Sequence, residues 1–585
     1  MAPPTVSPTT VDLNVGRLPH EYPRTFVPDG ANLGEWAQIE PLLQALERAP
    51  LNTALEVQDW LTRRSELDAC LGEEGSVRHI RMMMNTADET IRKAFMVWVE
   101  DLSPRLKEAG ERLDRQLFSS PGFSTLGPDY VVFVRSLKNR LELFRQENIP
   151  LEIEEEKTAQ SYQQLIGAMT VPFQGEDRTI PQLQKFLEEP DRGVRESAWK
   201  AMREKYRAED ETLETCFDRL RNIRQQQAKN AGSDNYRDYA FRCYQRFEYT
   251  PGDCAAFHEA VERHVVPLIA KLRVKRAERM GLSVMRPWDE GADAESRPPL
   301  KPFERTDQFV AATSKIFKQL DDEFSGYFDQ MSSLGLLDLD NRRNKAPGGF
   351  LAMLGETRLP FIFMNAVGRP TDVVTLIHES GHAFHAYLCR NQPLADFRGS
   401  PLEFAEVASM GMELLSAHLW DAYYPSPDHF KRARADHWKR VVWILPWVAT
   451  IDSFQHWMYT HPDHTREERA AKWLEIFKRF HPGLDISGLE LLMAKSWHAQ
   501  THVFTSPFYY IEYGIAQLGA LQLWRNAQQD PAQALSQYKK GLALGASRPL
   551  PELFQAAGLR FEFGAPIMAE LMQDVEFQLS ALGEL

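Results

Sequence analysis

The sequence has few of the features that mark secreted, membrane-spanning or disulfide-linked proteins. The longest apolar run, residues 441–451, contains Pro446 and is too short to span a bilayer. Residues 1–10 lack both the basic start and the apolar core of a secretion signal. The 585 residues include only five cysteines, scattered without a CxxC spacing: Cys70, Cys216, Cys243, Cys254 and Cys389. Such a set indicates free thiols in a reducing compartment, so we expect a cytoplasmic protein.

An excess of positive charge is also absent. Lys and Arg total 68 and Asp and Glu total 82, which gives a formal net charge of −14. A net-acidic chain is unlike a general nucleic-acid binder or a binder of anionic membranes. The composition, 43% hydrophobic and 26% charged, is that of a globular protein, and the length predicts two or three lobes rather than one core.

Helical periodicity dominates what is present. It is clearest in residues 36–46, 86–117 and 191–229. A stretch at 281–302 carries four prolines and predicts a loop or hairpin between lobes. One β-like segment, residues 360–367, follows later. The pattern predicts a mostly α protein with a small sheet.

The sequence His378-Glu379-Ser-Gly-His382 carries the main chemical signal. Pro370 with Thr371 or Asp372 as the cap predicts a helix that runs to about residue 390. His378 and His382 then stand one turn apart on one face, where two imidazoles can hold one Zn²⁺. Glu379 is rotated by about 100° from His378. It is therefore placed to act as a general base and not as a ligand.

A catalytic zinc needs a third protein ligand. The class with His-Glu-x-x-His-x-x-Gly-x-x-His is excluded, because this chain has His385 and Leu388 where Gly and His would stand. Glu403 falls in a Ser-Pro-Leu-Glu sequence that predicts a capping box with Ser400. Glu406 lies inside the predicted helix, where it has no capping role, and it is flanked by small and apolar residues. A carboxylate in that setting requires a partner, so Glu406 is the predicted third ligand.

Two further groups of side chains allow more than one interpretation. Glu413 lies two turns beyond Glu406, and it either accepts a ligand histidine's second N–H or is an ordinary surface glutamate. Near the C-terminus, Tyr510 and Tyr513 share a helix face after His502. Phenol and imidazole groups can donate hydrogen bonds to the oxyanion that forms in peptide hydrolysis. Aromatic residues at helical spacing are otherwise core.

With these segments in one order, the sequence resembles the thimet oligopeptidase and neurolysin family, in its oligoendopeptidase F branch. The best match is the segment 378–385, HESGHAFH, and the segments 406–413 and 502–514 resemble the family's third-ligand and tyrosine-rich segments. Weaker similarity extends the resemblance to about residues 160–570. Gly348-Gly349, before the β-like segment 360–367, resembles the family's substrate-edge region, and we expect that segment to be a sheet edge that can pair with an extended peptide.

The resemblance implies a mainly helical, two-lobed zinc metallopeptidase with a small β-sheet beside a deep substrate channel. Region 1–280 would form one wall of the channel, and region 281–585 would be catalytic. By matching positions, one zinc ion is held by His378, His382 and Glu406, and Glu379 is the base. His502, Tyr510 and Tyr513 match residues that contact the substrate or the oxyanion. His498 is the rival of His502, because the spacing in this loop varies among family members.

We therefore expect an endopeptidase that acts on short peptides, without nucleic-acid or membrane partners. A peptidyl-dipeptidase on the same fold is the alternative, and the products from a single peptide would separate the two. A catalytically silent peptide-binding protein would be expected to have lost part of the motif, and all four of its key residues are intact here. The sequence does not indicate side-chain preference or oligomeric state.

Overall fold

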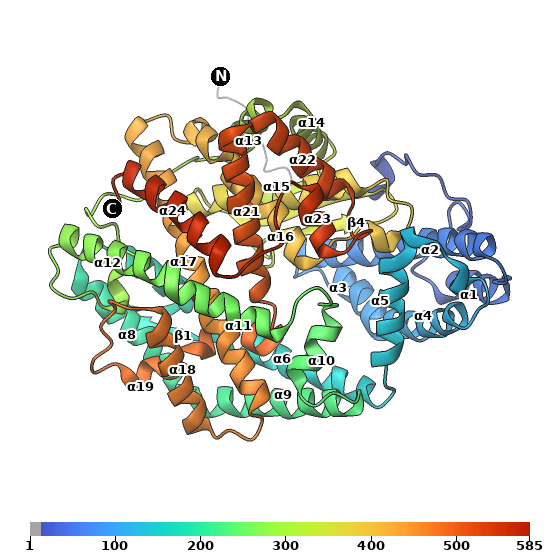
Figure 1. Cartoon of the computed structure of the whole chain (residues 1–585), viewed down its shortest axis with the longest axis horizontal. Coiled ribbons are helices and arrows are strands. Elements are labelled where there is room, and N and C mark those ends of the chain that lie inside the picture. The colour runs from blue at the N-terminus through green and yellow to red at the C-terminus, as the bar shows by residue number, and fades with distance from the viewer. Residues whose placement is uncertain (1–12) are drawn as a thin grey trace. The chain divides into compact units, whose positions relative to one another are not determined.

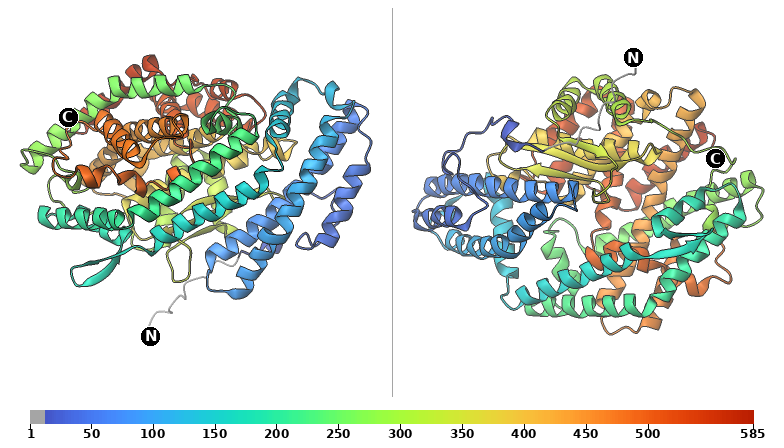
Figure 2. Two further views of the ribbon diagram at one scale, coloured as in Figure 1. Left: turned by 90° about the horizontal axis from the view of Figure 1, so that it is seen from below. Right: turned by 180° about the vertical axis from the view of Figure 1, so that it is seen from behind.

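The computed structural model describes residues 13–585 (Figures 1 and 2). Contact patterns divide these residues into two compact units. Unit 1 contains the described residues up to Leu141 together with Leu300–Ala433 and Gly519–Phe561. Unit 2 contains Glu142–Pro299, Arg434–Leu518 and Glu562–Leu585. Each unit therefore combines segments from both sides of residue 280. The role of region 1–280 as a channel wall stays a prediction, and segment 1–10 lies outside the described residues.

Unit 1 is mostly helical with one small sheet. Its helices, including short 3-10 and π turns, are η1 (Val15–Arg17), α1 (Trp36–Arg48), α2 (Ala54–Met84), α3 (Glu89–Val97), η2 (Trp98–Leu102), α4 (Ser103–Phe118), η3 (Phe123–Thr125), η4 (Pro128–Tyr130), α5 (Val131–Leu143), α13 (Thr306–Leu320), α14 (Asp322–Ser333), α15 (Pro370–Cys389), η8 (Ala395–Phe397), α16 (Leu402–Ser416), η9 (Ala417–Ala422), α22 (Pro531–Ala543) and α23 (Leu550–Ala556). Its strands are β3 (Leu337–Asp340), β4 (Phe350–Leu354) and β5 (Leu359–Ala366).

Unit 2 is helical apart from one hairpin. Its elements are α6 (Asn148–Ala168), β1 (Thr170–Phe173), β2 (Glu176–Thr179), α7 (Ile180–Gln184), η5 (Lys185–Glu188), α8 (Arg192–Ala208), α9 (Asp210–Asn230), α10 (Tyr236–Cys243), α11 (Pro251–Ala260), η6 (Val261–Val265), α12 (Val266–Met280), η7 (Pro287–Asp289), α18 (Arg466–Phe480), α19 (Glu490–Met493), η10 (Ser496–Ala499), α20 (Thr501–Thr505) and α24 (Ala565–Ala581). Most of α17 (Pro427–Thr460) and the start of α21 (Ile511–Gln529) also belong to it.

The predicted mostly α architecture is confirmed, and so is the helix that carries the HExxH sequence. Its predicted cap is wrong. Arg369 is the N-cap residue and Pro370 begins α15, so the helix starts two or three residues earlier than predicted. The Asp372 carboxylate then lies in the first turn and accepts hydrogen bonds from the backbone N–H groups of Val367 and Arg369, at 2.7 and 2.9 Å. A carboxylate at this place satisfies N–H groups that the helix leaves without partners.

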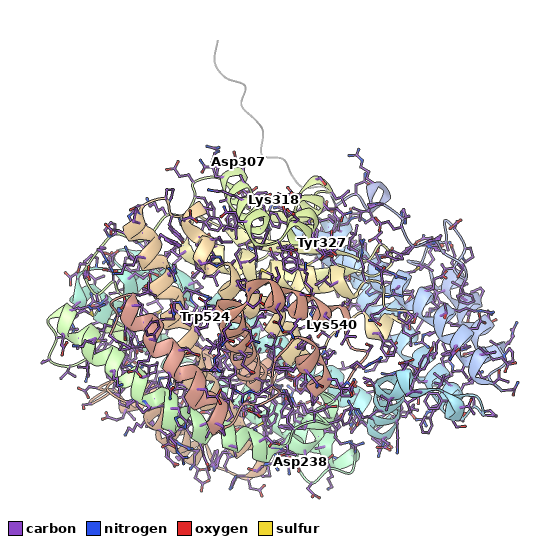
Figure 3. All side chains as sticks on the ribbon, turned by 45° about the horizontal axis from the view of Figure 1, so that its top comes forward. Asp238, Asp307, Lys318, Tyr327, Trp524 and Lys540 are labelled. Atoms are coloured by element: carbon purple, nitrogen blue, oxygen red, sulfur yellow. The ribbon has the colours of Figure 1, made fainter. Side chains whose placement is uncertain are left out.

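Aromatic stacking fixes α15 against α14 within unit 1. The rings of Tyr327, labelled in Figure 3, and Tyr387 lie parallel with centroids 4.4 Å apart. Phe324 and Phe384 stack in the same way at 4.6 Å. Rings in contact over these areas bury a large apolar surface and define one geometry. The HExxH helix therefore has a firmly held back face.

The predicted strand 360–367 is confirmed as β5, but its predicted role as a free sheet edge is wrong. The strand order is β3-β5-β4, with β3 parallel and β4 antiparallel to β5. Both sides of β5 are therefore hydrogen-bonded to neighbours, and β4 is an edge strand of the sheet. It begins directly after Gly348-Gly349, the segment that the sequence associated with a substrate edge.

The proline-rich stretch 281–302 is largely irregular, as predicted, with only the short turn η7 inside it. Gly281 ends α12 in the left-handed conformation, at φ 65°. Glycine reaches this conformation without steric cost. One boundary between the two units, Pro299 to Leu300, lies in this stretch. No helix among residues 13–585 combines the length and apolarity needed to cross a membrane.

Candidate metal centre and catalytic residues

Helix α15 presents His378 and His382 on one face, one turn apart. Their ring centroids lie 5.0 Å apart and their planes are nearly perpendicular, at 86°. Both side chains are partly exposed, at 22% and 19%. The helical spacing thus gives two imidazoles that point toward one small volume, as the sequence predicted.

Helices α15 and α16 approach each other closely because Gly381 has no side chain. A Cβ atom at this position would lie 2.6 Å from the Ala408 carbonyl oxygen and 2.7 Å from the Cα atom of Ser409. Both atoms belong to the backbone of α16, so the helices would have to separate. The Tyr538 hydroxyl from α22 donates to the same Ala408 carbonyl at 2.7 Å, which holds α16 in place. The glycine between the two histidines is therefore a packing requirement.

This close approach brings Glu406 of α16 to the two histidines. Its Oε2 atom lies 3.4 Å from His378 Nε2 and 3.8 Å from His382 Nε2. The ligand atoms of the three residues all lie within 4.8 Å of one another. Metal–ligand bonds of about 2.0–2.2 Å in a tetrahedron separate neighbouring ligand atoms by about 3.3–3.6 Å. Both the donor set and its spacing fit one Zn²⁺ with an open coordination position.

Two further side chains of α16 orient this group. Glu413 Oε1 lies 2.7 Å from His378 Nδ1, which confirms the predicted hydrogen bond to a ligand histidine and not the surface alternative. An Nδ1–H of His378 donates to this carboxylate, which turns Nε2 toward Glu406 and the candidate metal position. Ser409 Oγ donates to Glu406 Oε2 at 3.0 Å, a contact that the sequence analysis missed.

Glu379 lies beside this group and is only 9% exposed. Burial raises the pKa of its carboxyl to about 7, and the nearby charges of Glu406 and Glu413 act in the same direction. The His378 charge and a hydrogen bond from the Leu351 N–H oppose the shift. Since Leu351 is on β4, the carboxylate is next to that edge strand. A buried carboxyl with a raised pKa is suited to accept and return a proton.

His385 and Glu403 are close in sequence to the candidate ligands but do not belong to the metal-binding group. His385 is 5% exposed, packs edge-on against Phe404, and its burial lowers its pKa to about 3. It is a packing histidine. Glu403 is also buried, and the predicted capping box with Ser400 is wrong: α16 begins at Leu402, and its N-cap residue, Pro401, makes no side-chain capping bond. Pro401 has a non-helical ψ of 139°, so the helix starts after it and Ser400 lies outside the first turn.

His502, Tyr510 and Tyr513 form one aromatic cluster within unit 2. The His502 ring lies 4.9 Å from Tyr510 and 6.3 Å from Tyr513, edge-on to each, and the two tyrosine rings are 5.5 Å apart. The rival His498 is fully buried elsewhere, with Nε2 3.4 Å from Glu214. The geometry favours His502 as the histidine associated with the tyrosines. The roles of all three residues stay predictions.

The segment before Tyr510 is held by residues that the sequence analysis did not identify. Arg246 donates to the Phe508 carbonyl at 2.6 Å and to Glu512 at 2.7 Å. Gln455 accepts the Phe508 N–H at 2.9 Å. Phe508 itself has a φ of 68°, which is unusual for a residue with a side chain. Contacts between residues so distant in sequence leave no local signal.

Comparison with known proteins agrees with this arrangement. Residues 185–573 match the model of peptidase family M3, and residues 35–144 match the peptidase M3 N-terminal domain. An oligoendopeptidase F homologue of Borreliella burgdorferi is 26% identical over 261 residues. That match covers 42% of this chain and 42% of the relative's length.

Solved structures extend the similarity to nearly the whole chain. A structure of Pz peptidase A with an inhibitor is 26% identical, with a TM-score of 0.85, and covers 94% of this chain and 97% of that one. A structure described as oligoendopeptidase F is 29% identical, with a TM-score of 0.85, and covers 96% and 98%. Another, from Bacillus anthracis strain Ames, is 25% identical, with a TM-score of 0.81 and the same coverage. The expected family resemblance and helical fold are confirmed, and the chain belongs to peptidase family M3.

Proposed function

We propose that this protein is a zinc-dependent endopeptidase that hydrolyses internal bonds of short oligopeptides. The observation that carries the proposal is the convergence of His378, His382 and Glu406 in unit 1, with Glu379 beside them. These three residues would hold one zinc ion. When bound, zinc would polarise the scissile carbonyl and make an attacking water more acidic.

The chain's own residues have distinct roles in this proposal. Glu379 accepts the proton of the attacking water and passes it to the leaving amine. Glu413 keeps the His378 ring in one orientation through its Nδ1–H. His502, Tyr510 and Tyr513 donate hydrogen bonds to the substrate or the oxyanion, a role carried over from the family resemblance.

The substrate backbone binds along the edge strand β4. The strand's antiparallel partner β5 covers only one of its sides, and the Leu351 N–H interacts with Glu379. An extended peptide can hydrogen-bond to such an edge with little dependence on its side chains. The names of the oligoendopeptidase F relatives support short peptides as substrates. The net charge of −14 supports peptide rather than nucleic-acid substrates.

We also propose a cytoplasmic location. None of the five cysteines, all of which lie in the described part of the chain, forms a disulfide. This is the expected state of thiols in a reducing compartment.

Glu379→Gln tests the proposed mechanism directly. The substitution keeps the shape of the side chain but removes its ability to take a proton, so zinc content and folding should match the wild type. The kcat on a peptide of about ten residues should fall by several orders of magnitude. Mass spectrometry of the wild-type products should show internal cuts, whereas successive release of C-terminal dipeptides would instead indicate a peptidyl-dipeptidase. More than a tenth of wild-type activity in the zinc-loaded variant would refute the role of Glu379.

A further inference from the structure

A second group of metal-binding side chains lies within unit 2, on helices α11 and α17. Cys254 and His258 are four residues apart on α11, and Asp452 and His456 are four residues apart on α17. Each pair therefore shares one helix face. The ligand atoms of Cys254, Asp452 and His456 lie within 4.8 Å of one another. None of the four residues has a part in the proposed peptidase mechanism.

One separation between candidate ligand atoms in this group matches that of a tetrahedral zinc site. Asp452 Oδ2 lies 3.3 Å from His456 Nε2, close to the separation of about 3.3–3.6 Å between neighbouring ligands of tetrahedral zinc. His258 Nε2 lies 2.8 Å from the same oxygen. His258 thus holds the carboxylate in place and leaves its second oxygen available.

The second carboxylate oxygen of Asp452, Oδ1, is the unusual feature of this group. Asp452 is completely buried, and its Oδ1 atom has no hydrogen-bond partner. A buried carboxylate oxygen without a partner is costly and calls for an explanation such as an ion. Cys254 is also completely buried, and the His456 ring is enclosed edge-on by Phe241 and Phe508. The unsatisfied oxygen therefore lies in a buried position, where charges interact strongly.

The local charge balance suits a divalent cation. A Cys254 thiolate and the Asp452 carboxylate together carry two negative charges, which one Zn²⁺ would neutralise. Two arginines of unit 2 have carboxylate partners of their own. Arg479 binds Glu262 at 2.6 Å and Arg246 binds Glu512 at 2.7 Å. Each of these two charges is therefore balanced by a carboxylate of its own.

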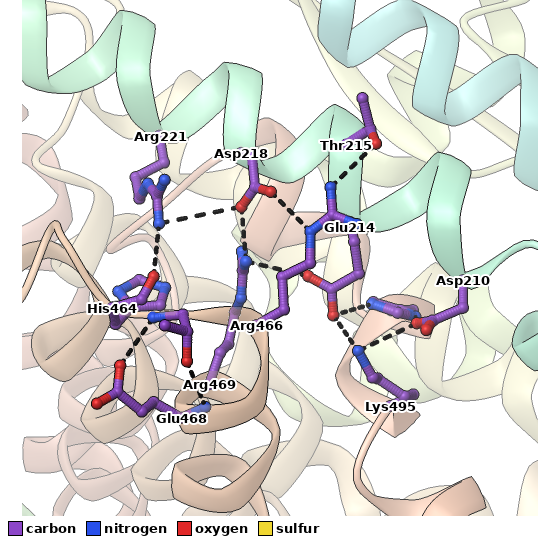
Figure 4. Close-up of polar contacts among 12 residues, drawn as sticks. Asp210, Glu214, Thr215, Asp218, Arg221, His464, Arg466, Glu468, Arg469 and Lys495 are labelled. Atoms are coloured by element: carbon purple, nitrogen blue, oxygen red, sulfur yellow. Dashed lines mark hydrogen bonds and ion pairs between the residues drawn. The ribbon is translucent and has the colours of Figure 1, made fainter.

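A second cluster in unit 2 shows what an arrangement unsuited to a metal looks like. Asp210 and Glu214, labelled in Figure 4, have ligand atoms that lie within 4.8 Å of each other and of His498. There, however, Lys495 contacts both carboxylates and Arg469 lies 3.1 Å from Glu214. These two cations already neutralise the acidic groups and would repel a metal. The α11–α17 group has no such cation in contact with Asp452 among the described residues.

We propose that Cys254, Asp452 and His456 bind a second zinc ion, with His258 positioning Asp452. Thiolate, imidazole and carboxylate together are a ligand set that zinc favours. The ion would join two helices nearly two hundred residues apart in sequence, and its binding would stabilise unit 2. The proposal is independent of the peptidase mechanism, because it involves neither α15 nor α16.

Metal analysis of the full-length protein, purified under reducing conditions and saturated with zinc, tests the stoichiometry. The wild type should contain two zinc ions per chain. The double variant His378→Ala/Glu406→Ala should retain one ion, and Cys254→Ser should lose one ion while keeping the other. One ion per chain in the saturated wild type would overturn the proposal.

Cobalt gives a site-specific readout. The centre formed by His378, His382 and Glu406 contains no sulfur, so a thiolate-to-cobalt charge-transfer band in the near ultraviolet can report only a cysteine-containing site. Wild-type protein loaded with two equivalents of Co²⁺ should show the band, and Cys254→Ser should not. Cys70→Ser, a control at a buried cysteine of unit 1, should retain it.

The outcomes remain separable if a variant folds poorly. Should Cys254→Ser be unstable, His456→Gln provides the same test from the partner helix, because it removes a nitrogen ligand and leaves the thiol. Loss of one zinc ion from His456→Gln, with the α15 site still loaded, would support the proposal. A cobalt band absent from the wild type, or unchanged in Cys254→Ser or His456→Gln, would refute it.

Discussion

At the scale of single residues, removing the hydroxyl group of Tyr510 or Tyr513 distinguishes a catalytic role of these side chains from a packing role. Substitution of either by Phe keeps the ring and its contacts, so folding should be unchanged. If the hydroxyl binds the oxyanion, kcat should fall about 10²-fold with little change in KM, because the interaction forms only in the transition state. Steady-state kinetics on one peptide measures this.

A matched control lies in the same cluster. The Tyr509 ring contacts that of Tyr513 at a centroid distance of 5.4 Å, but the family resemblance assigns it no contact with the substrate. Tyr509→Phe should therefore keep wild-type kcat. Equal, unchanged kinetics in all three variants would mean that the cluster is only core packing.

At the scale of secondary-structure elements, the contact between α15 and α16 should decide both stability and metal affinity. Gly381→Ala places a methyl group against the backbone of α16. Overpacking of this kind typically costs about 1–3 kcal/mol, and separating the helices also moves Glu406 away from the histidines. Lower thermal stability and weaker zinc binding in a chelator competition are expected.

Gly326→Ala is the matched control for this substitution. Gly326 lies inside α14, and a Cβ atom there would meet nothing within 4 Å. Alanine in an open helical position should stabilise the protein by about 0.5–1 kcal/mol. If Gly381→Ala behaved like Gly326→Ala, the close approach of the two helices would not matter for the metal centre.

Also at this scale, the ion pairs that join α9 to the segment around Lys495 should make unit 2 sensitive to acid (Figure 4). Burial opposes ionisation of Glu214, but its hydrogen bond to His498 and the charges of Arg469 and Lys495 outweigh burial and lower its pKa to about 2. The unfolded-state pKa is about 4.3. The stabilisation is thus complete above about pH 4.5 and is lost as pH falls toward 2, by up to about 3 kcal/mol.

Thermal denaturation at several pH values checks this expectation. Glu214→Gln should be less stable than the wild type at pH 7, because Lys495 and Arg469 lose a charged partner. The difference between the two proteins should shrink as pH falls from 5 to 2.5. A difference that stayed constant over this range would show that the Glu214 charge does not contribute.

At the scale of the whole molecule, substrate length is the property to measure. The resemblance implies that region 1–280 forms a wall of a channel. A folded protein would have to unfold before its backbone could enter, at a free-energy cost of about 5–15 kcal/mol. Peptides of about ten residues should be cut internally, whereas folded proteins and long chains such as reduced casein should resist. A digestion series with peptides of increasing length tests this. Steady cleavage of full-length casein by wild type but not by Glu379→Gln would contradict the channel.

Much of the candidate site could be predicted because its signals are local. The i,i+4 spacing of the histidines follows from helix geometry, and Glu406 and Glu413 stood out by their apolar surroundings and by their place two turns apart. The caps were less predictable. The start of α15 lies two or three residues before the predicted one and the start of α16 one residue after it, since the choice depends on which backbone groups find partners in the folded chain.

The sequence by itself determined the chemistry of this protein: which side chains can bind a metal, which can carry a proton, and that most of the chain is helical. These properties depend on residue type and on backbone periodicity within a few turns. Only the tertiary structure decided that β4 rather than β5 is an edge strand, that Gly381 sets the distance between α15 and α16, and that Cys254 meets His456. Each depends on which surfaces are buried against each other, and residues far apart in sequence acquire that relation only when the chain packs.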